Sequence, residues 1–169
     1  MPTFAKYIIY FLIYSTLGAL LETGFRLVTE QHWYGIHGFL HLPLFPIYGF
    51  GALLILLIAR YIRNPIILFF VGGVAVSILE FAAHWLIEVI FNDRIWSYEN
   101  GTPTLGGRIS LLSSFWFSVA AVVLVYIIHP RVVKLVKRIP SREVMVIVVL
   151  AGLVVLFDII FSIVERLIH

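Results

Sequence analysis

The chain has 169 residues, of which 62% are hydrophobic and 12% charged, with a formal net charge of +3 at pH 7. Soluble domains are usually about 45–50% apolar and about 25% charged, so the composition excludes a soluble globular domain and predicts an integral membrane protein. The chain contains no cysteine, which excludes disulfides, thiolate metal ligands and catalytic thiols.

The apolar runs predict five membrane-spanning helices, and therefore an all-α, polytopic integral membrane helix bundle that forms a single transmembrane domain over residues 1–169. The predicted spans are residues 3–30, 46–63, 65–92, 109–129 and 142–168. Four of them are long enough to cross about 30 Å of hydrocarbon at about 1.5 Å per residue. The second is short, and a re-entrant segment around Pro43 and Pro46 is the alternative to a full crossing.

Prolines and glycines indicate where the second and third spans begin. Proline suits the first turn of a helix because its missing N–H would have no partner there. We therefore expect one helix to begin at Pro46 and another at Pro65, directly after Asn64. Between them, Gly49 and Gly51 are small enough to let the backbone of a neighbouring helix approach closely.

Basic residues mark a surface segment and an orientation. Residues 130–140 place four basic side chains at helical spacing between apolar ones, which predicts a short amphipathic segment at the lipid headgroups; these are Arg131, Lys134, Lys137 and Arg138. With five spans, eight of the 12 Lys and Arg residues lie on the side of the N-terminus and four on the other. The positive-inside rule then predicts a multi-pass protein of the cell inner (cytoplasmic) membrane with a cytoplasmic N-terminus. Loops 31–45 and 93–108 would then face outward. The basic residues are few and lie at the ends of spans, which does not indicate nucleic-acid binding.

Carboxylates interrupt or end the apolar runs, and they are Glu22, Glu80, Glu88, Asp158 and Glu165. An ionised carboxylate at the bilayer centre costs about 2.5–3.5 kcal/mol on insertion scales, so such residues normally face protein or water. In the third span Glu80, His84 and Glu88 recur every fourth residue, which places all three on one helix face. Glu165 alone is expected at the membrane interface.

This face predicts one wall of a polar, outward-facing cavity, with Glu22 and Arg26 on the opposite wall. The predicted substrate-binding residues are Glu22, Arg26, Tyr48, Glu80, His84, Glu88, Trp96, Tyr98 and Arg108. Two alternatives stay open: a cluster of ion pairs and hydrogen bonds that only ties helices together, and acids that face lipid near the interface.

Two of these residues have alternative placements. Tyr48 either lies in the aromatic belt at the membrane interface or donates its hydroxyl to one of the glutamates. Arg108, after the turn predicted at Gly106 and Gly107, either extends to the lipid headgroups or reaches into the carboxylate cluster.

Three histidines are the candidates for a metal site. Imidazole and carboxylate are ligands of zinc and iron, so His37, His41 and His84 are the candidates. The chain has no HExxH pattern, and His37 and His41 lie in a loop that contains glycine and proline. We therefore predict no metal site and no cofactor. The phosphate-cradling GxxxxGK[ST] pattern and the GxSxG pattern are also absent, so the chain does not hydrolyse ATP by that route.

Several blocks of sequence occur together in a fixed order: "YSTLGALLE" (14–22), "HGFLHLPLFPIYGFGAL" (37–53), "LEFAAHWLIE" (79–88), "WSY" (96–98), and "GGRISL" to "IIHP" (106–130). In these blocks the chain resembles the family described as putative ABC-transporter type IV, small bacterial multi-span membrane proteins, over roughly residues 10–130. The resemblance implies transport, and it implies motif roles for Glu22, Tyr48, Glu80, Glu88, Trp96, Tyr98 and Arg108. The chain departs from the family pattern at Ile36-His37, His84 and Ser97, so the resemblance supports the fold more than any ligand chemistry.

Three functions follow from these patterns. The first is a small transporter or transporter component, a putative permease that requires a separate ATPase, another membrane subunit or a proton gradient. The second is a membrane-embedded enzyme that uses Glu and His as acid–base groups on a lipid-like substrate, although we do not favour an enzyme. The third is a non-catalytic scaffold subunit. Small residues at Gly18, Gly72 and Gly73 fit either a compact monomer or a homodimer.

Overall fold

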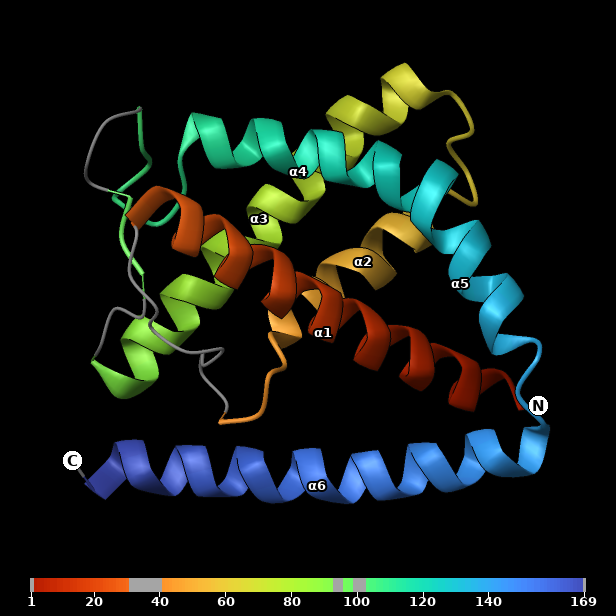
Figure 1. Ribbon diagram of the computed structural model, residues 1–169. Helices are drawn as coiled ribbons and strands as arrows, with labels where there is room; N and C mark the ends of the chain where they lie inside the picture. The colour runs from red at the N-terminus through yellow and green to blue at the C-terminus, as the bar shows by residue number, and fades with distance from the viewer. Residues whose placement is uncertain (1, 31–40, 93–95, 99–102, 169) are drawn as a thin grey trace. The chain divides into compact units, whose positions relative to one another are not determined.

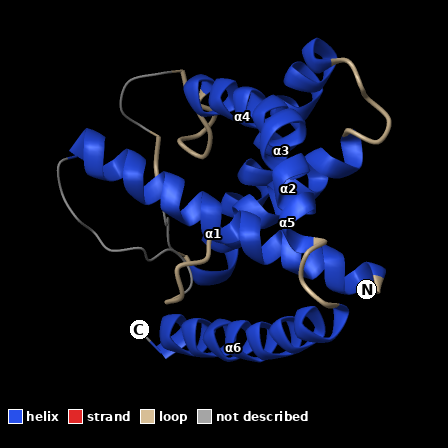
Figure 2. Cartoon of the chain, turned by 45° about the vertical axis from the view of Figure 1, so that its right-hand side comes forward, coloured by secondary structure: helices blue, strands red, loops and turns tan. Residues whose placement is uncertain are grey.

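The computed structural model describes residues 2–30, 41–92, 96–98 and 103–168, without the side chains of residues 25, 26, 28–30 and 166–168. Its elements are α1 (Thr3–Glu30), α2 (Pro46–Ile58), α3 (Pro65–Phe91), α4 (Leu111–Val123), the π-helical turn η1 (Leu124–Ile128), α5 (His129–Val136) and α6 (Ser141–Ile168) (Figure 1). Across this described chain Figure 2 shows helices joined by loops, and β pairing is limited to one isolated bridge between Thr104 and Ser110. The prediction of an all-α protein is confirmed.

Within the described residues, four stretches are long and apolar enough to cross a membrane, and they are Thr3–Gly24, Pro65–Phe91, Leu111–Val136 and Ser141–Glu165, with mean hydropathies from 1.6 to 3.1. The short helix α2 differs from them because it has 13 residues. At about 1.5 Å per residue it reaches roughly 20 Å, less than the roughly 30 Å of a hydrocarbon core. The chain is thus a polytopic membrane protein, and a membrane crossing by α2 stays a prediction.

Both predicted helix starts are confirmed. Pro46 is the first residue of α2 and Pro65 is the first residue of α3. Asn64 caps α3, because its side-chain oxygen accepts hydrogen bonds from the N–H groups of Ile66 at 2.9 Å and Ile67 at 3.3 Å. A cap of this kind satisfies donors that the first helical turn leaves without a partner.

The helix that begins at Leu111 continues through Pro130 to Val136. A proline inside an α-helix removes one N–H and crowds the carbonyl four residues earlier. Here the preceding turn is π-helical, and the N–H of His129 bonds to the carbonyl of Leu124, five residues back. This wider turn accommodates the proline, and the helix axis changes direction between α4 and α5 (Figure 1).

The amphipathic segment α5 has its apolar side chains Val132 and Val136 buried, whereas Arg131 and Lys134 are exposed. Its basic side is therefore the side available to anionic headgroups or to a partner. The predicted position of residues 130–140 at the lipid surface stays a prediction.

Internal contacts divide the chain into two compact units, residues 1–50 with 137–169, and residues 51–136. In the first unit α1 packs against α6. It also touches the start of α2, since a Cβ on Gly18 would overlap the Tyr48 ring and a Cβ on Gly49 would overlap Ser15 and Phe11. The predicted close approach at Gly49 is confirmed.

In the second unit α3 packs along α4. Gly72 lies against Ala121, and a Cβ on Gly73 would overlap the side chain of Ser118. Gly51 makes only ordinary contact, because a Cβ there would be 3.7 Å from the nearest atom of Val76. The glycines on α3 thus serve helix packing, as small residues do in membrane bundles.

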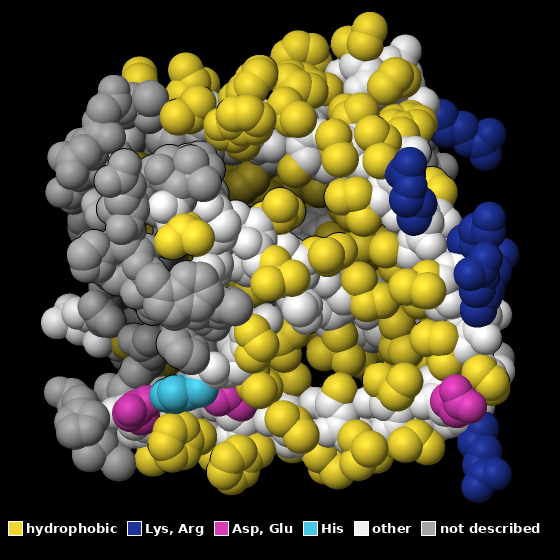
Figure 3. Space-filling view, in the orientation of Figure 1, with side chains coloured by type: hydrophobic (Ala, Val, Ile, Leu, Met, Phe, Trp, Pro, Cys, Tyr) yellow, Lys and Arg dark blue, Asp and Glu magenta, His cyan; other side chains and the backbone are white. Residues whose placement is uncertain are grey.

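The surface of α6 matches a membrane-facing helix. Hydrophobic side chains cover its middle on the visible face, and charged side chains lie near its two ends (Figure 3). Exposed large side chains of this helix include Leu153, Phe157, Ile160 and Val164. In water such a surface is unfavourable, whereas in lipid it is the expected one.

Candidate functional site

A polar face occupies the C-terminal half of α3. Glu80 and His84 are 6% and 2% exposed, and Glu88 lies one turn further on, in the last turn of the helix. All three contact residues of the connection between α3 and α4. The single face predicted from their spacing is therefore covered by the chain that follows it.

Tyr98 and Trp96 bring this connection onto the helix. The hydroxyl of Tyr98 donates a 2.8 Å hydrogen bond to Glu80 Oε1. His84 Nε2 lies 2.8 Å from the backbone carbonyl oxygen of Trp96, and the two rings meet edge to face with centroids 4.9 Å apart. Because a carbonyl oxygen only accepts, Nε2 carries the proton of this bond.

The other nitrogen of His84 is less constrained. Nδ1 lies 3.8 Å from Glu88 Oε2, beyond hydrogen-bond distance. Among the described residues, no hydrogen-bond partner lies against His84 Nδ1 or against the indole Nε1 of Trp96, although both atoms are buried. With Nε2 protonated, Nδ1 is a free acceptor in a neutral imidazole.

Arg108 supplies the positive charge of the site. Its Nε and Nη2 donate to Glu88 Oε2 at 2.9 and 2.7 Å, and both side chains are 23% exposed. The guanidinium also lies 5.6 Å from the ring centroid of Phe81. The structure thus decides between the two predicted placements of Arg108, in favour of the carboxylate cluster.

A tight turn holds Arg108 in place. Gly106 and Gly107 have φ angles of 61° and 71°, the left-handed region that glycine adopts without strain, and this confirms the predicted turn. The N–H of Tyr98 donates to the carbonyl of Gly107 at 2.9 Å. Ser110 then begins α4 with a capping box completed by Ser113. These contacts fix the tyrosine and the arginine relative to each other.

We call the resulting group the α3 cluster, and it consists of Glu80, His84, Glu88, Trp96, Tyr98 and Arg108. It is one site within the second unit. Its titratable groups are two carboxyl groups, one guanidinium, one imidazole and one phenol.

The other three predicted site residues belong to the first unit. The hydroxyl of Tyr48 donates a 2.7 Å hydrogen bond to Glu22 Oε2, which decides the placement of Tyr48 in favour of a glutamate. The side chain of Arg26 lies outside the described residues. The predicted cavity between Glu22 and the α3 cluster stays a prediction.

The family model described as "Putative ABC-transporter type IV" matches residues 9–163 of the chain. The chain belongs to this family. No curated protein and no solved structure matches the chain. The α3 cluster lies wholly inside the range matched by the type IV family, as do Glu22 and Tyr48.

Of the three histidines predicted as metal candidates, the structure describes His41 and His84. His37 lies outside the described residues. In the described parts of the chain no group of three His, Cys, Asp or Glu side chains is arranged to hold a metal ion. His84 is engaged in the α3 cluster, and His41 contacts α6 instead.

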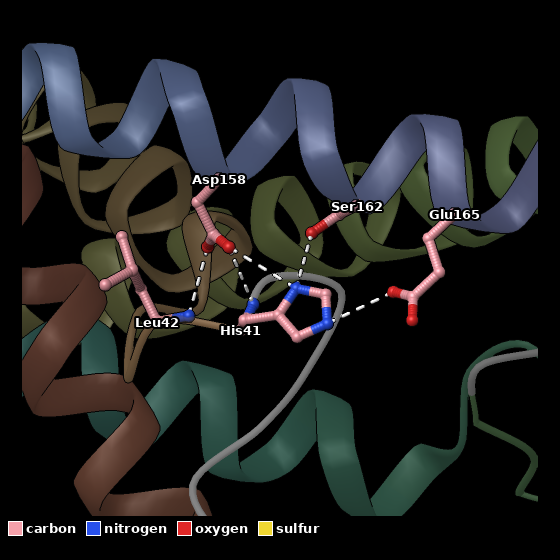
Figure 4. Close-up of polar contacts among 5 residues, drawn as sticks. All are labelled: His41, Leu42, Asp158, Ser162 and Glu165. Carbon is pink, nitrogen blue, oxygen red and sulfur yellow. Dashed lines mark hydrogen bonds and ion pairs between the residues drawn. The ribbon is translucent and has the colours of Figure 1, made fainter.

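A second polar group on α6 was not predicted as a site. Figure 4 shows His41 and Leu42 against Asp158, Ser162 and Glu165. We call these five residues the α6 cluster; the type IV family match includes Asp158 and Ser162 and ends before Glu165. A signal was present in the sequence, because Asp158, Ser162 and Glu165 are spaced i, i+4 and i+7 and so share one helix face. Nothing local to that helix, however, indicates a histidine more than a hundred residues earlier.

Proposed function

We propose that this member of the type IV family is a small transporter, or the membrane-spanning component of one, that binds a cationic solute at the α3 cluster. The observation that carries the proposal is the bound guanidinium of Arg108 at Glu88. Glu88 is a carboxylate in a candidate span with a mean hydropathy of 2.4, and it already holds a cation of the chain itself. Charged residues in such spans commonly mark a solute pathway.

The chemistry of the cluster favours an organic cation with N–H donors, such as an amine or a guanidine. Glu88 offers a carboxylate, and the free acceptor His84 Nδ1 lies 3.8 Å from it. The indole of Trp96 is the kind of ring that attracts cations to its face. A solute that binds Glu88 has to displace Arg108, so binding and movement of Arg108 are coupled.

The proposal includes an outward-facing cavity at this end of α3, because the predicted orientation places residues 93–108 outside the cell. The sequence contains no phosphate-cradling loop of the Walker type. The family description is that of an ABC transporter, so we propose a separate ATPase subunit as the energy source.

Thermal unfolding of the purified protein in lipid nanodiscs tests the binding step. The probes are monovalent and divalent metal ions, choline, spermidine and arginine, each over a range of concentrations. We expect an amine or guanidine to raise the melting temperature of the wild type. Glu88→Gln and His84→Ala should lose this rise, whereas Glu143→Gln, an exposed position at the start of α6, should keep it.

Uptake into proteoliposomes then tests transport of the cation that stabilises the protein. The proposal is wrong if no cation of the panel raises the melting temperature, or if Glu88→Gln responds as the wild type does.

The pairing within the α3 cluster favours one other function, a scaffold subunit. Glu80, Glu88 and Arg108 each bond to another residue of the cluster, which is what a group that only joins helices requires. A scaffold predicts that Glu88→Gln loses stability, that no cation changes the melting temperature, and that a membrane partner co-purifies.

A further inference from the structure

The α6 cluster places an imidazole ring between two carboxylates at different depths of one helix (Figure 4). His41 Nε2 lies 3.1 Å from Glu165 Oε2. On the other side of the ring, Nδ1 lies 3.4 Å from Asp158 Oδ1 and 3.1 Å from Ser162 Oγ. Each ring nitrogen therefore faces a different carboxylate.

The two carboxylates have different surroundings. The side chain of Asp158 is 9% exposed, whereas that of Glu165 is 46% exposed. Asp158 accepts hydrogen bonds from the backbone N–H groups of Leu42 at 3.0 Å and His41 at 3.3 Å. These two backbone bonds fix the position of the Asp158 carboxylate, with Oδ1 close to the ring of His41.

Their depths differ as well. Glu165 lies in the last turn of α6, which ends at Ile168. Asp158 precedes it by two helical turns, which corresponds to about 10 Å along the helix axis. A group that connects Glu165 to Asp158 therefore connects the end of α6 to the interior of that helix.

The side chain of His41 is 49% exposed and contacts α6. Its ring packs edge to face against Phe161, with centroids 5.1 Å apart. The segment that carries it is tied to α1 as well, because the N–H of Phe45 donates to the carbonyl of Ser15 at 3.2 Å. The charged groups that the described structure places against the ring are Asp158 and Glu165, both on α6; on α1, which packs against α6, Glu22 is bonded to Tyr48.

We propose that the α6 cluster is a proton relay, in which His41 passes protons between the accessible Glu165 and the buried Asp158. Protonated Glu165 gives its proton to Nε2 of His41, which becomes an imidazolium. The imidazolium then releases the proton on Nδ1 to Oδ1 of Asp158. The products are ionised Glu165, a neutral imidazole with its proton on Nε2, and a neutral carboxylic acid at Asp158, so one proton has moved inward. The same two transfers in reverse return the proton from Asp158 to Glu165 and restore the imidazole with its proton on Nδ1, so the relay equilibrates the protonation of the two carboxylates.

Imidazole suits this step because both of its nitrogens exchange protons under physiological conditions. Chains of Asp, Glu and His inside membrane spans serve as proton relays in pumps and transporters. The relay goes beyond cation binding at the α3 cluster and involves none of its residues.

Stopped-flow infrared spectroscopy after a pH jump tests the relay on the full chain in nanodiscs. The C=O stretching band of protonated Asp158 is assigned by its loss in Asp158→Asn. In the wild type we expect this band to rise when the pH drops within a range of about 4 to 9. In His41→Ala we expect its rate of rise to fall by about 10²-fold, the lower end of what a positioned acid–base group contributes, and free imidazole in the buffer should restore part of that rate.

A second variant guards against misfolding of His41→Ala. Glu165→Gln removes the carboxylate at the half-exposed position, and it should also lower the rate at which the Asp158 band rises. Glu143→Gln, at the other end of α6, should not. The relay is wrong if the Asp158 band does not appear at any pH in the range, or if it rises at the wild-type rate in His41→Ala and Glu165→Gln. No solute is present, so this outcome does not depend on the outcome of the cation-binding experiment.

Discussion

Arg108 donates from both Nε and Nη2 to a single oxygen of Glu88, at 2.9 and 2.7 Å. Glu88 belongs to the last turn of α3, and Arg108 lies just before α4. The pair therefore joins the two ends of a long connection at the point where the helices meet. Because each side chain is mostly shielded from solvent, removal of one partner leaves the charge of the other uncompensated.

The first prediction concerns this pair. We expect Glu88→Leu to lower the free energy of unfolding by about 3 kcal/mol, the lower end of the range for one-sided removal of a buried pair. The double variant Glu88→Leu, Arg108→Leu should recover more than half of that loss, because no charge is left unpaired. Unfolding of the purified protein in mixed micelles by added SDS measures both values.

Glu143→Gln is the matched control, because Glu143 is an exposed acid in the first turn of α6. It should change the free energy of unfolding by less than about 0.5 kcal/mol. Equal losses in the single and the double variant would show that the pair contributes packing and not charge compensation.

The second prediction concerns the hydroxyl of Tyr98. Tyr98→Phe removes the donor to Glu80, which is buried, and an unsatisfied buried acceptor costs about 1–3 kcal/mol. Tyr61→Phe is the control, since Tyr61 is 83% exposed. The same SDS titration should show a loss for Tyr98→Phe and almost none for Tyr61→Phe. Similar values for the two variants would contradict a stabilising role for the tyrosine at Glu80.

Local rules of sequence predicted much of the fold and part of the site. Pro46 and Pro65 marked helix starts because proline is restricted to few helix positions. The four-residue spacing of Glu80, His84 and Glu88 predicted a shared face, and the turn at Gly106 and Gly107 was also foreseen. These features depend on residues close together in the chain, where geometry follows directly from helix periodicity.

Contacts between distant segments followed no local rule. His41 and Asp158 are separated by 117 residues, and the sequence showed each as a separate polar residue in or near an apolar run. For Tyr48 and Arg108 the sequence likewise allowed two placements, a bond to a glutamate or a position at the membrane interface. Both placements suit an amphipathic side chain. These cases are decided by the packing of α1 against the start of α2, of His41 against α6, and of the α3–α4 connection against α3.

The third prediction concerns the packing of α3 on α4. A Cβ on Gly73 would overlap the side chain of Ser118 and would lie 3.2 Å from its Cα. Gly73→Ala should therefore destabilise the protein by about 1–3 kcal/mol, the usual cost of overpacking. Gly152→Ala on α6 is the control, because no atom lies within 4 Å of the added Cβ. There the helix propensity of alanine should stabilise the protein by up to about 1 kcal/mol. If Gly73→Ala is as stable as the wild type, α3 and α4 are not in the close contact described above.

The fourth prediction concerns the path of the chain through the membrane, and it depends on the short helix α2. In both arrangements the positive-inside rule places Arg60, Arg63 and the basic residues of α5 in the cytoplasm. If α2 crosses, the N-terminus lies on that side as well. If α2 turns back, only the four long spans cross, and the N-terminus lies outside. The N-terminus therefore distinguishes the two.

Single cysteines decide between them, because the chain has none of its own. Thr3→Cys, Leu105→Cys and Lys134→Cys all occupy exposed positions. A membrane-impermeant maleimide added to intact cells should label Leu105→Cys, and it should label Thr3→Cys and Lys134→Cys only after lysis. This pattern follows from the five predicted spans, in which the N-terminus and the basic residues of α5 share the cytoplasmic side. Labelling of both Thr3→Cys and Leu105→Cys in intact cells, with Lys134→Cys still protected, would show that α2 does not cross and that the predicted second span is wrong.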